Sequence, residues 1–346
     1  MKKIAVIGHF GQGENLLNGQ TIKTKIVTLE LKKRIGNNNI EIIDTYGGAK
    51  SYYRLPFQIF NALKNCRNII VFPGQNGVRV IVPLICVLNL FFKRKTHYVV
   101  IGGWLPAFLI NKKILVKQLK QFAGIYVETE AMEKALKKQG FNNIYVMPNC
   151  KDLQILEDKD LIYNNSLPLR LCTFSRVMKE KGILDAVDAV KTINTRFSEV
   201  KYTLDIYGQI DKNQIEWFES ICKDFPYYIN YKGMIPYNRS TEVVRSYDAV
   251  LFPTYYEGEG FAGTIIDAMA AGVPVIASDW KYNTELISNG YNGVLFNTRN
   301  IEQLVDVLED VYQNNSKWVS MKGNCLQEAR KYTPDNCIKV LINMLA

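Results

Sequence analysis

The sequence predicts an α/β fold of two Rossmann-like, doubly wound domains that face each other across a cleft. A length of 346 residues suits two domains of ordinary size. Short apolar runs that end at glycine or proline alternate with stretches of helical periodicity, which is the pattern of successive βα units. A polar, acidic segment at residues 151–168 divides these units into two halves of similar size. We therefore expect domains at residues 1–160 and 161–335.

The first domain is expected to begin with a strand over residues 4–8, followed by a glycine-containing loop from Gly8 to Gly13. A helix that runs to about Arg34 should follow Asn18-Gly19-Gln20-Thr21, because its apolar residues recur at near-helical spacing. Further strands are expected at residues 40–43, 69–72, 98–101, 125–127 and 144–146. The GxGxxG fingerprint is absent after the first strand, so a nicotinamide cofactor is not indicated.

Two helices of the first domain are unusually apolar or basic. Residues 78–92 are almost wholly apolar, but a helix that crosses a bilayer needs about 20 residues. We expect a buried helix here, with a helix that dips into a membrane as the alternative. Residues 110–122 mix four lysines with apolar residues, which fits either a helix lying against lipid headgroups or a solvated basic face.

The second domain is expected to open with a strand over residues 169–174, then Arg176 and Lys181, then a helix at about Ile183. Two fixed cations beside a helix N-terminus suit a diphosphate, although taken alone they also fit ordinary surface charges. Strands over residues 203–207 and 229–231 are followed by Gly208 and Gly233, which repeats the pattern of a strand and then a glycine.

The most informative segment is residues 248–278. It predicts a short buried strand, a loop with three glycines, a helix over residues 264–271 and a second strand over residues 275–277. This arrangement points helix-end N–H groups at a ligand above the sheet, which is a natural anion site. Glu259 lies on the loop and Asp267 on the helix, and an acidic residue beside such a site commonly binds a ribose. Alone, the glycine loop also fits an ordinary βαβ turn.

The same segment resembles the glutamate–seven residues–glutamate motif of retaining GT-B glycosyltransferases of family 4. The matching residues are Glu259-Gly260-Phe261-Ala262, Asp267-Ala268-Met269-Ala270 and Gly272-Val273-Pro274-Val275-Ile276-Ala277. Two positions depart from the family pattern: Ala262 stands where glycine is usual, and Asp267 stands where the second glutamate is usual. The loop with its following Gly263-Thr264 is similar to that of bacterial capsule and surface-polysaccharide enzymes.

The resemblance implies a retaining transferase that moves a hexosyl sugar from a nucleotide diphosphate sugar to a glycan acceptor in surface polysaccharide biosynthesis. Arg176 and Lys181 would stabilise charge on the departing diphosphate. Glu259 would bind the sugar hydroxyls, and Asp267 would hold the ribose. No metal or other cofactor is expected, because side chains supply the positive charge. The remaining donor-loop residues of this interpretation are Gly260, Phe261, Ala262, Gly263 and Thr264.

The resemblance also assigns residues outside the motif. Gly19 occupies the place of a loop that closes over the donor diphosphate, and Gly208 lies on a loop that flanks the nucleobase. Many family members carry a histidine after a first-domain strand; Gly102-Gly103 occupies that place here, and His9 is the candidate substitute. The last helix, residues 336–346, would pack back on the first domain.

Charge is distributed unevenly along the chain. Residues 1–150 hold 22 Lys and Arg against 7 Asp and Glu, whereas residues 151–346 hold 21 against 26. No acidic residue occurs between Asp44 and Glu128. A basic half either has an anionic partner or tolerates its own charge repulsion. We expect an anionic membrane surface and a polyprenyl-diphosphate-linked acceptor rather than nucleic acid.

The compartment follows from the cysteines and the N-terminus. Seven scattered cysteines without metal spacing indicate reduced thiols, and no secretory leader is expected at Met1. We therefore expect a cytoplasmic protein, peripheral on the inner face of the cell membrane.

Three alternatives remain open at this stage. A GT-B protein of another reaction, such as an epimerase or phosphorylase, would share the fold. A catalytically inactive scaffold would share the motif, although Arg176, Lys181 and Glu259 are all present. A nucleic-acid-binding module would explain the basic half but not the segment around Glu259, and the chain lacks the aromatic and basic motifs of such folds.

Overall fold

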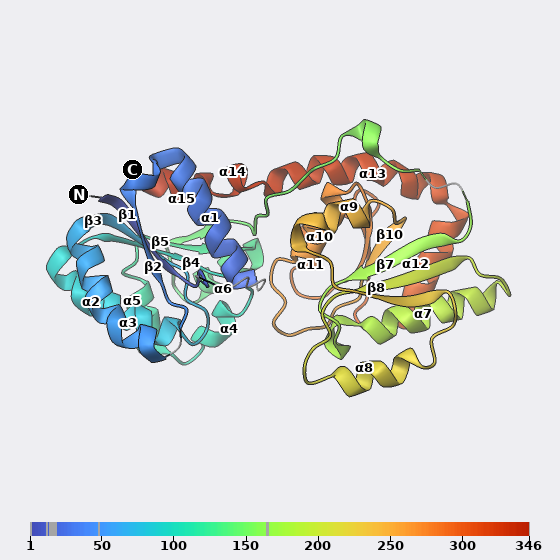
Figure 1. Cartoon of the computed structure of the whole chain (residues 1–346), viewed down its shortest axis with the longest axis horizontal. Coiled ribbons are helices and arrows are strands. Elements are labelled where there is room, and N and C mark those ends of the chain that lie inside the picture. Colours follow the sequence, from blue (N-terminus) through green and yellow to red (C-terminus); the bar gives the residue numbers. More distant parts are fainter. Residues whose placement is uncertain (1, 12, 14–18, 48, 164–165, 346) are drawn as a thin grey trace. The chain divides into compact units, whose positions relative to one another are not determined.

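In the computed structural model the chain forms two compact units (Figure 1). Unit 1 comprises Met1–Asp152 with Tyr332–Ala346, and unit 2 comprises Leu153–Lys331. The structure describes residues 2–11, 13, 19–47, 49–163 and 166–345. The boundaries expected from the sequence are residues 160 and 335, and those of the compact units are 152 and 331.

Unit 1 is built on a six-stranded parallel sheet with the order β2-β1-β3-β4-β5-β6. Its strands are β1 (Lys2–Gly8), β2 (Ile40–Asp44), β3 (Cys66–Val71), β4 (Lys95–Val99), β5 (Gly124–Val127) and β6 (Ile144–Val146). Apolar runs such as Ile4–Ile7 are buried on both faces, as expected for a parallel sheet covered by helices. Each strand predicted for the first half is therefore confirmed as a strand, although β3 and β4 begin three residues earlier than the predicted 69–72 and 98–101.

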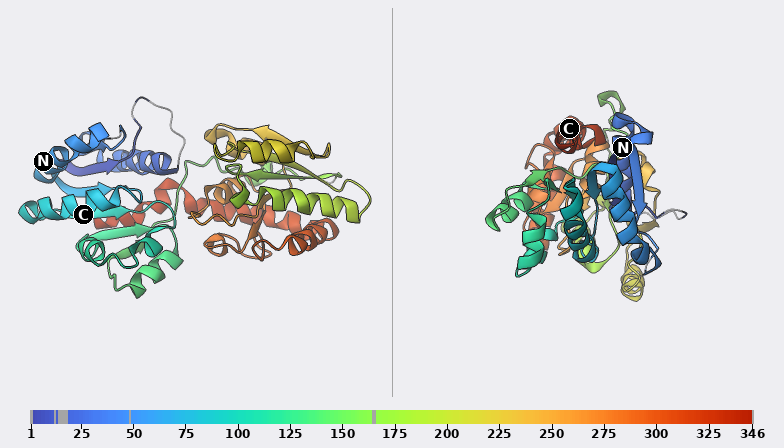
Figure 2. Two further views of the ribbon diagram at one scale, coloured as in Figure 1. Left: turned by 90° about the horizontal axis from the view of Figure 1, so that it is seen from below. Right: turned by 90° about the vertical axis from the view of Figure 1, so that its left-hand side faces the viewer.

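Helices cover both faces of this sheet (Figures 1 and 2). They are α1 (Gly19–Ile35), α2 (Ala49–Asn65), α3 (Val78–Phe92), α4 (Leu105–Leu109), α5 (Lys113–Leu119), α6 (Glu130–Lys138), α14 (Pro334–Cys337) and α15 (Lys339–Met344). Helix α1 contacts α14, and α3 contacts both α2 and α5. The C-terminal segment is held to unit 1 by an ion pair between Arg34 and Asp335 and by a hydrogen bond from Asn68 Nδ2 to Leu345 O of 3.2 Å.

Helix α3 has the bounds expected from the sequence, but the expectation that it is buried is wrong for its outer side. Val78, Ile81, Val82 and Ile85 are buried against the sheet. Leu90 and Phe91 are 69% and 80% exposed, because the sheet covers only one side of the helix. Within the described part of the chain, no helix is both long and apolar enough to cross a membrane.

Unit 2 repeats the plan with a second six-stranded parallel sheet, in the order β12-β11-β10-β7-β8-β9. Its strands are β7 (Leu169–Phe174), β8 (Tyr202–Tyr207), β9 (Ile229–Gly233), β10 (Ala249–Phe252), β11 (Val275–Ser278) and β12 (Gly293–Phe296). Its helices are α7 (Ile183–Arg196), α8 (Ile215–Cys222), α9 (Ser240–Val244), α10 (Gly263–Ala270), α11 (Asn283–Leu286), α12 (Ile301–Gln313) and α13 (Asn315–Ala329). Helix α12 contacts α7, whereas α10 contacts α9 and α13 (Figure 1).

The strand order of each sheet fixes where a ligand can bind. In unit 1 the order reverses between β1 and β3, and in unit 2 it reverses between β7 and β10. Connections leave such a pair of strands on opposite faces, so a crevice opens at their carboxyl ends. Two doubly wound sheets confirm the predicted fold class, and the cleft between the two domains stays a prediction.

Candidate functional site

The loops that follow β7 and β10 are packed together at the reversal point of the unit 2 sheet. Tyr255 N donates a hydrogen bond of 2.8 Å to Glu180 O. Gly182 lies against Pro253 with φ +69°, and a Cβ at Gly182 would stand 2.1 Å from the Pro253 carbonyl oxygen. Only glycine allows both this backbone conformation and this approach. These contacts therefore fix the backbones of the two loops relative to each other.

Lys181 and Glu259 meet at the centre of this arrangement. Lys181 is the last residue of a 3₁₀ turn, Lys179–Lys181, that precedes α7, and Glu259 lies on the loop before α10. Lys181 Nζ lies 2.5 Å from Glu259 Oε2, and the two side chains are 13% and 9% exposed. The sequence predicted both as site residues and placed each against a ligand, but it did not predict that they contact each other.

Thr254 is a member of this cluster that the sequence analysis missed. It lies two residues after the end of β10, is completely buried, and donates through Oγ1 to Glu259 Oε2 over 2.9 Å. Its position five residues before Glu259 carries no recognisable signal, because a threonine after a buried strand is ordinary. The contact arises only because the loop folds back on itself.

Arg176 lies on the loop after β7, like Lys181, but outside the buried cluster. Its side chain is 58% exposed, and Nη1 lies 3.6 Å from Asp211 Oδ2. Such a long and exposed pair contributes little to stability, so the guanidinium can turn toward a ligand at small cost. The structure thus places Arg176 and Lys181 on one loop, one exposed and one enclosed.

Helix α10 begins at the same edge of the sheet. Ala262 is its N-cap residue and Gly263 its first residue. Thr264 Oγ1 donates to Phe174 O over 2.6 Å, which ties the start of the helix to the end of β7. The helix therefore directs its N-terminal N–H groups toward the carboxyl ends of the strands.

The remaining residues of the motif are more enclosed. Phe261 and Asp267 are buried, at 7% and 3% exposed, and Gly260 is half-buried. Asp267 lies on the second turn of α10 and is shorter than the glutamate usual at this place. Its burial leaves little side-chain surface for a ribose, so that role stays a prediction.

Gly208 follows β8 at the neighbouring position of the sheet edge. Its φ is +140°, and a Cβ there would stand 1.7 Å from Ser175 O, so the backbone of the two loops touches. Tyr231 Oη donates to Gly208 O over 2.8 Å. This places the predicted nucleobase loop beside the loop that carries Arg176.

Unit 1 presents a separate group at the carboxyl end of β1. His9 Nδ1 lies 2.7 Å from Thr21 Oγ1, and the His9 ring packs edge-on against Tyr46 with centroids 5.2 Å apart. Gly19 is the first residue of α1 and is exposed; its loop, residues 14–18, lies outside the described residues. Both predicted residues thus lie at the reversal point of this sheet.

A second lysine–glutamate pair is buried in unit 1, and no sequence pattern predicted it. Lys23 Nζ lies 2.6 Å from Glu128 Oε1, with the side chains only 1% and 3% exposed. Lys23 also donates to Val100 O over 3.3 Å. These partners leave the ammonium group enclosed by protein.

Burial also shifts the pKa values of titratable groups outside the site. Burial, helped by the positive charge of Lys95, lowers the pKa of His97 to about 4. Burial raises the pKa of Asp185, which stands at the start of α7. In both cases burial disfavours the charged form of the group.

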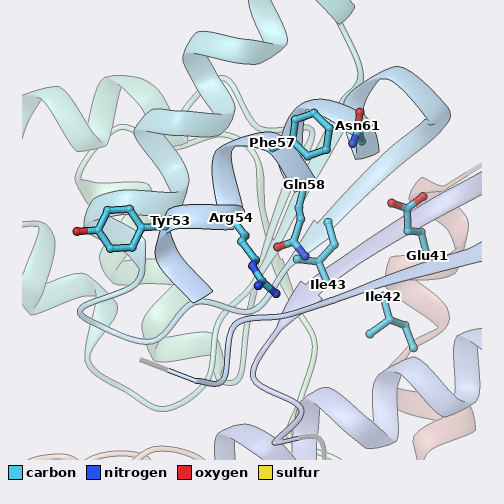
Figure 3. A pocket seen from close by; sticks show the side chains of 8 residues that line it. All are labelled: Glu41, Ile42, Ile43, Tyr53, Arg54, Phe57, Gln58 and Asn61. Carbon is cyan, nitrogen blue, oxygen red and sulfur yellow. The ribbon is translucent and has the colours of Figure 1, made fainter. Parts of the chain in front are cut away.

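A pocket of about 530 Å³ lies between β2 and α2 in unit 1 (Figure 3). Arg54 and Gln58 point from the helix toward the strand, beside Ile43. None of the residues predicted from the sequence lines it. Within the described residues, no group of three or more histidine, cysteine, aspartate or glutamate side chains is placed to hold a metal ion.

Comparison with known families finds a match in the second half of the chain. Residues 164–331 match the Glycosyl transferases group 1 family. This segment holds Arg176, Lys181, Gly208 and Glu259, and it covers most of unit 2.

Two curated relatives are also named as glycosyltransferases. The chain is 24% identical over 227 residues to the N,N'-diacetylbacillosaminyl-diphospho-undecaprenol alpha-1,3-N-acetylgalactosaminyltransferase of Campylobacter jejuni, covering 64% of the chain and 51% of that protein. It is 30% identical over 175 residues to the UDP-N-acetylglucosamine–peptide N-acetylglucosaminyltransferase GtfA subunit of Streptococcus gordonii, covering 49% and 33%. The chain thus spans between a third and about half of the length of these relatives.

A solved structure matches the whole chain. The complex of Anabaena Alr3699/HepE with UDP superposes with a TM-score of 0.76 at 14% identity, covering 100% of this chain and 99% of that one. At this identity the likeness establishes the fold. The chain has the two Rossmann-like domains of GT-B glycosyltransferases, as the sequence predicted.

Proposed function

We propose that the protein is a retaining glycosyltransferase of family 4 that transfers a hexosyl sugar from a nucleotide diphosphate sugar to a glycan acceptor. One observation carries the proposal: Lys181 and Glu259 lie 2.5 Å apart at the reversal point of the unit 2 sheet, within the segment that matches the Glycosyl transferases group 1 family. A cation and a carboxylate at this edge suit the two parts of such a donor, its diphosphate and its sugar.

Positive charge and N–H groups of unit 2 would stabilise the departing diphosphate. Lys181 is held near the start of α10, and Arg176 can reach the same edge from its exposed position. Backbone N–H groups at Gly263 and Thr264 add partial positive charge. Such preorganised donors contribute about 3–4 kcal/mol each to the stabilisation of developing negative charge. This chemistry needs no metal ion.

Glu259 would bind the hydroxyls of the transferred sugar and orient its ring, and Asp267 would hold the ribose. The departing phosphate would help to deprotonate the acceptor, which attacks on the face that the leaving group vacates. His9 on unit 1 is the candidate for a further contact with the sugar, and Gly19 for one with the diphosphate. Attack of the acceptor on the face that the leaving group vacates would retain the configuration at the anomeric carbon.

Donor binding is tested by thermal stabilisation with UDP-, GDP-, TDP- and ADP-sugars. We expect the UDP series to bind, since HepE was solved with UDP and the GtfA relative is named for UDP-N-acetylglucosamine. A ligand at 100 times its dissociation constant stabilises by about 2.7 kcal/mol. The shift should disappear in Lys181→Ala and persist in Lys179→Ala, a matched control on the same 3₁₀ turn. No shift with any of the four series would contradict the proposal.

The acceptor is proposed to be linked to a polyprenyl diphosphate at the inner face of the cell membrane, in surface or capsular polysaccharide biosynthesis. The name of the Campylobacter relative includes a diphospho-undecaprenol acceptor. The protein would then work as a cytoplasmic, peripheral membrane protein. Nucleic acid is not the proposed partner.

An apolar face on unit 1 supports membrane attachment. We use this name for the exposed apolar side chains of α2, α3, the end of α4 and the start of α5, namely Tyr53, Phe57, Phe60, Val80, Val87, Leu90, Phe91, Ile110 and Ile114. The rings of Phe60 and Phe92 pack 5.2 Å apart and join α2 to α3. Exposed cations flank this face, namely Arg54, Lys64, Arg79, Lys93, Lys113 and Lys117.

Its charge complements an anionic bilayer. The helices of the apolar face carry no acidic residue, since none occurs between Asp44 and Glu128. Each basic residue near an anionic leaflet contributes about 1 kcal/mol, and apolar side chains add by burial. Figure 3 shows Tyr53 and Phe57 extending from α2 at one end of this face.

Vesicle sedimentation tests the attachment. The protein should sediment with vesicles that contain phosphatidylglycerol and remain free with phosphatidylcholine vesicles. Phe91→Ser and the double change Lys113→Glu with Lys117→Glu should each weaken the association at least several-fold. The double change Lys223→Glu with Lys317→Glu on unit 2 alters the net charge equally and should have no comparable effect. Equal losses in both double variants would contradict a localised surface.

A further inference from the structure

One carboxylate oxygen of Glu259 has two partners. Lys181 Nζ lies 2.5 Å from Oε2, and Thr254 Oγ1 donates to the same oxygen over 2.9 Å. Among the described residues, the contacts of this cluster all go to Oε2, so the other oxygen, Oε1, is the one left for a ligand. The two partners differ in one respect that matters for function, which is their freedom to move.

Thr254 is fixed. It is completely buried, and its carbonyl accepts a hydrogen bond of 2.5 Å from Ser278 Oγ on β11. Its Oγ1 accepts from Tyr256 N over 3.2 Å, so its single hydroxyl proton is directed elsewhere. Of the two acceptors in reach, Glu259 Oε2 at 2.9 Å is closer and charged, whereas Glu180 O lies at 3.3 Å.

Lys181 can move. Its ammonium group ends a flexible four-carbon chain, and its side chain is 13% exposed. It lies 5.4 Å from the ring centroid of Phe252 and 5.3 Å from that of Tyr256, contacts that tolerate a shift of the charge. A diphosphate carries more negative charge than one carboxylate and can replace Glu259 as the partner of Lys181.

We propose that Thr254 is the positioning residue that keeps Glu259 in place while Lys181 exchanges that carboxylate for the diphosphate of the donor. In the free protein Lys181 neutralises Glu259. When a nucleoside diphosphate enters, the ammonium group turns to it, and the Thr254 hydroxyl alone retains Oε2. Glu259 Oε1 is thereby presented to the sugar. This inference rests on the proposed function and concerns the same site.

Two consequences separate the roles of the three side chains. Glu259 competes with the diphosphate for Lys181, so Glu259→Gln should bind a nucleoside diphosphate without sugar about threefold or more tightly than the wild type. Thr254 acts on the sugar through Glu259, so Thr254→Val should leave nucleoside diphosphate affinity unchanged. The same change should lower turnover by about 10- to 100-fold, the usual effect of losing a hydrogen bond to a charged group.

The experiment measures binding of UDP and of a UDP-sugar by calorimetry, and the release of UDP from the sugar nucleotide. Thr254→Val should lower turnover and reduce the ratio of UDP-sugar affinity to UDP affinity, and Thr254→Ser should restore both. Thr28→Val is the matched control, since the Thr28 hydroxyl is likewise buried and donates to Thr24 O over 2.7 Å on unit 1. Its turnover and affinities should equal those of the wild type.

Several results would overturn the inference. Wild-type turnover in Thr254→Val, equal losses in Thr254→Val and Thr254→Ser, or a parallel loss of UDP affinity would each remove the positioning role. Unchanged or weaker UDP binding in Glu259→Gln would remove the exchange of partners. Failure of the proposed function is distinguishable, because the wild type itself would then bind none of the nucleotide series.

Discussion

Each unit contains a lysine–glutamate pair near the carboxyl ends of its strands, and the two pairs differ in what surrounds them. Lys23 projects from helix α1, is 1% exposed, and has Val100 O as an additional acceptor near its partner Glu128. Lys181 lies on a 3₁₀ turn before a helix, is 13% exposed, and shares Glu259 with the hydroxyl of Thr254.

The difference shows how identical residue types acquire different roles. A pair that protein encloses on every side can only contribute to folding, because its desolvation is complete and no ligand reaches it. A pair on a loop that retains some exposure can exchange its partner. Charge and spacing alone do not separate the two cases, whereas burial and the supporting element do.

The two units also differ in the apolar and charged residues of their outer surfaces. Unit 1 exposes apolar side chains beside surface cations on α2 and α3, while residues 151–346 carry more acidic than basic residues. We infer a division in which unit 1 meets the acceptor and the membrane and unit 2 meets the donor. The following predictions test this contrast, beginning with the largest effect.

Lys23→Met should destabilise unit 1 by about 3–5 kcal/mol, because it leaves the Glu128 carboxylate buried without its partner. Urea unfolding followed by hydrogen exchange of unit 1 peptides measures the loss. Lys25→Met, an exposed change on the same helix, should stay within about 0.5 kcal/mol of the wild type. Nucleotide binding at unit 2 should survive in Lys23→Met under conditions where it remains folded, unlike in Lys181→Ala. Loss of binding there would break the contrast between the pairs.

Acid should destabilise unit 1 through His97. Burial, helped by the charge of Lys95, lowers its pKa from 6.5 to about 4. The unfolded chain therefore binds a proton at this histidine below pH 6.5, whereas the folded unit binds it only near pH 4. The free energy of unfolding should fall across this window by about 3 kcal/mol, at about 1.4 kcal/mol per pH unit. Unfolding at pH 7 and pH 4.5 should show a smaller difference in His97→Gln than in the wild type. Parallel pH profiles for the two proteins would refute the assignment.

Gly182→Ala should destabilise unit 2 by about 3 kcal/mol. The added Cβ would stand 2.1 Å from Pro253 O, and the residue would keep a φ of +69°. Gly290→Ala has a similar φ of +76° and open space around its Cβ, so it should cost only about 1 kcal/mol. Thermal melting of both variants isolates the effect of the close approach. Equal costs would show that the loop of Lys181 does not depend on this packing.

Helix caps should contribute equally in the two units. Thr129 accepts a hydrogen bond of 3.2 Å from Met132 N at the start of α6, and Asn300 accepts one of 3.0 Å from Gln303 N at the start of α12. Each change to alanine should cost about 1 kcal/mol, measured by urea unfolding. A cost confined to one unit would mean that the units differ in local helix stability as well as in their surfaces.

Much of the fold could be predicted because its signals are local. The apolar runs of strands such as 169–174 and 249–252, and the proline that ends the second of them, depend on neighbouring residues only. Helix α3 shows the limit of that reasoning. Its composition indicated burial, but which side of a helix meets the sheet, and how much of the rest is covered, depends on neighbouring helices.

The candidate site likewise combines features that local sequence predicts with contacts that it does not predict. The sequence by itself determined the fold class, the asymmetry of charge, and the placement of Arg176, Lys181 and Glu259 near the ends of strands, because these follow from local pattern and order along the chain. The contacts of Lys181 and Thr254 with one oxygen of Glu259, Oε2, depend on the tertiary structure. The burial of Lys23 with Glu128 depends on it as well. Lys181 and Glu259 are 78 residues apart, and Lys23 and Glu128 are 105 apart. Contacts across such separations are set by strand order and loop packing, which no local pattern encodes.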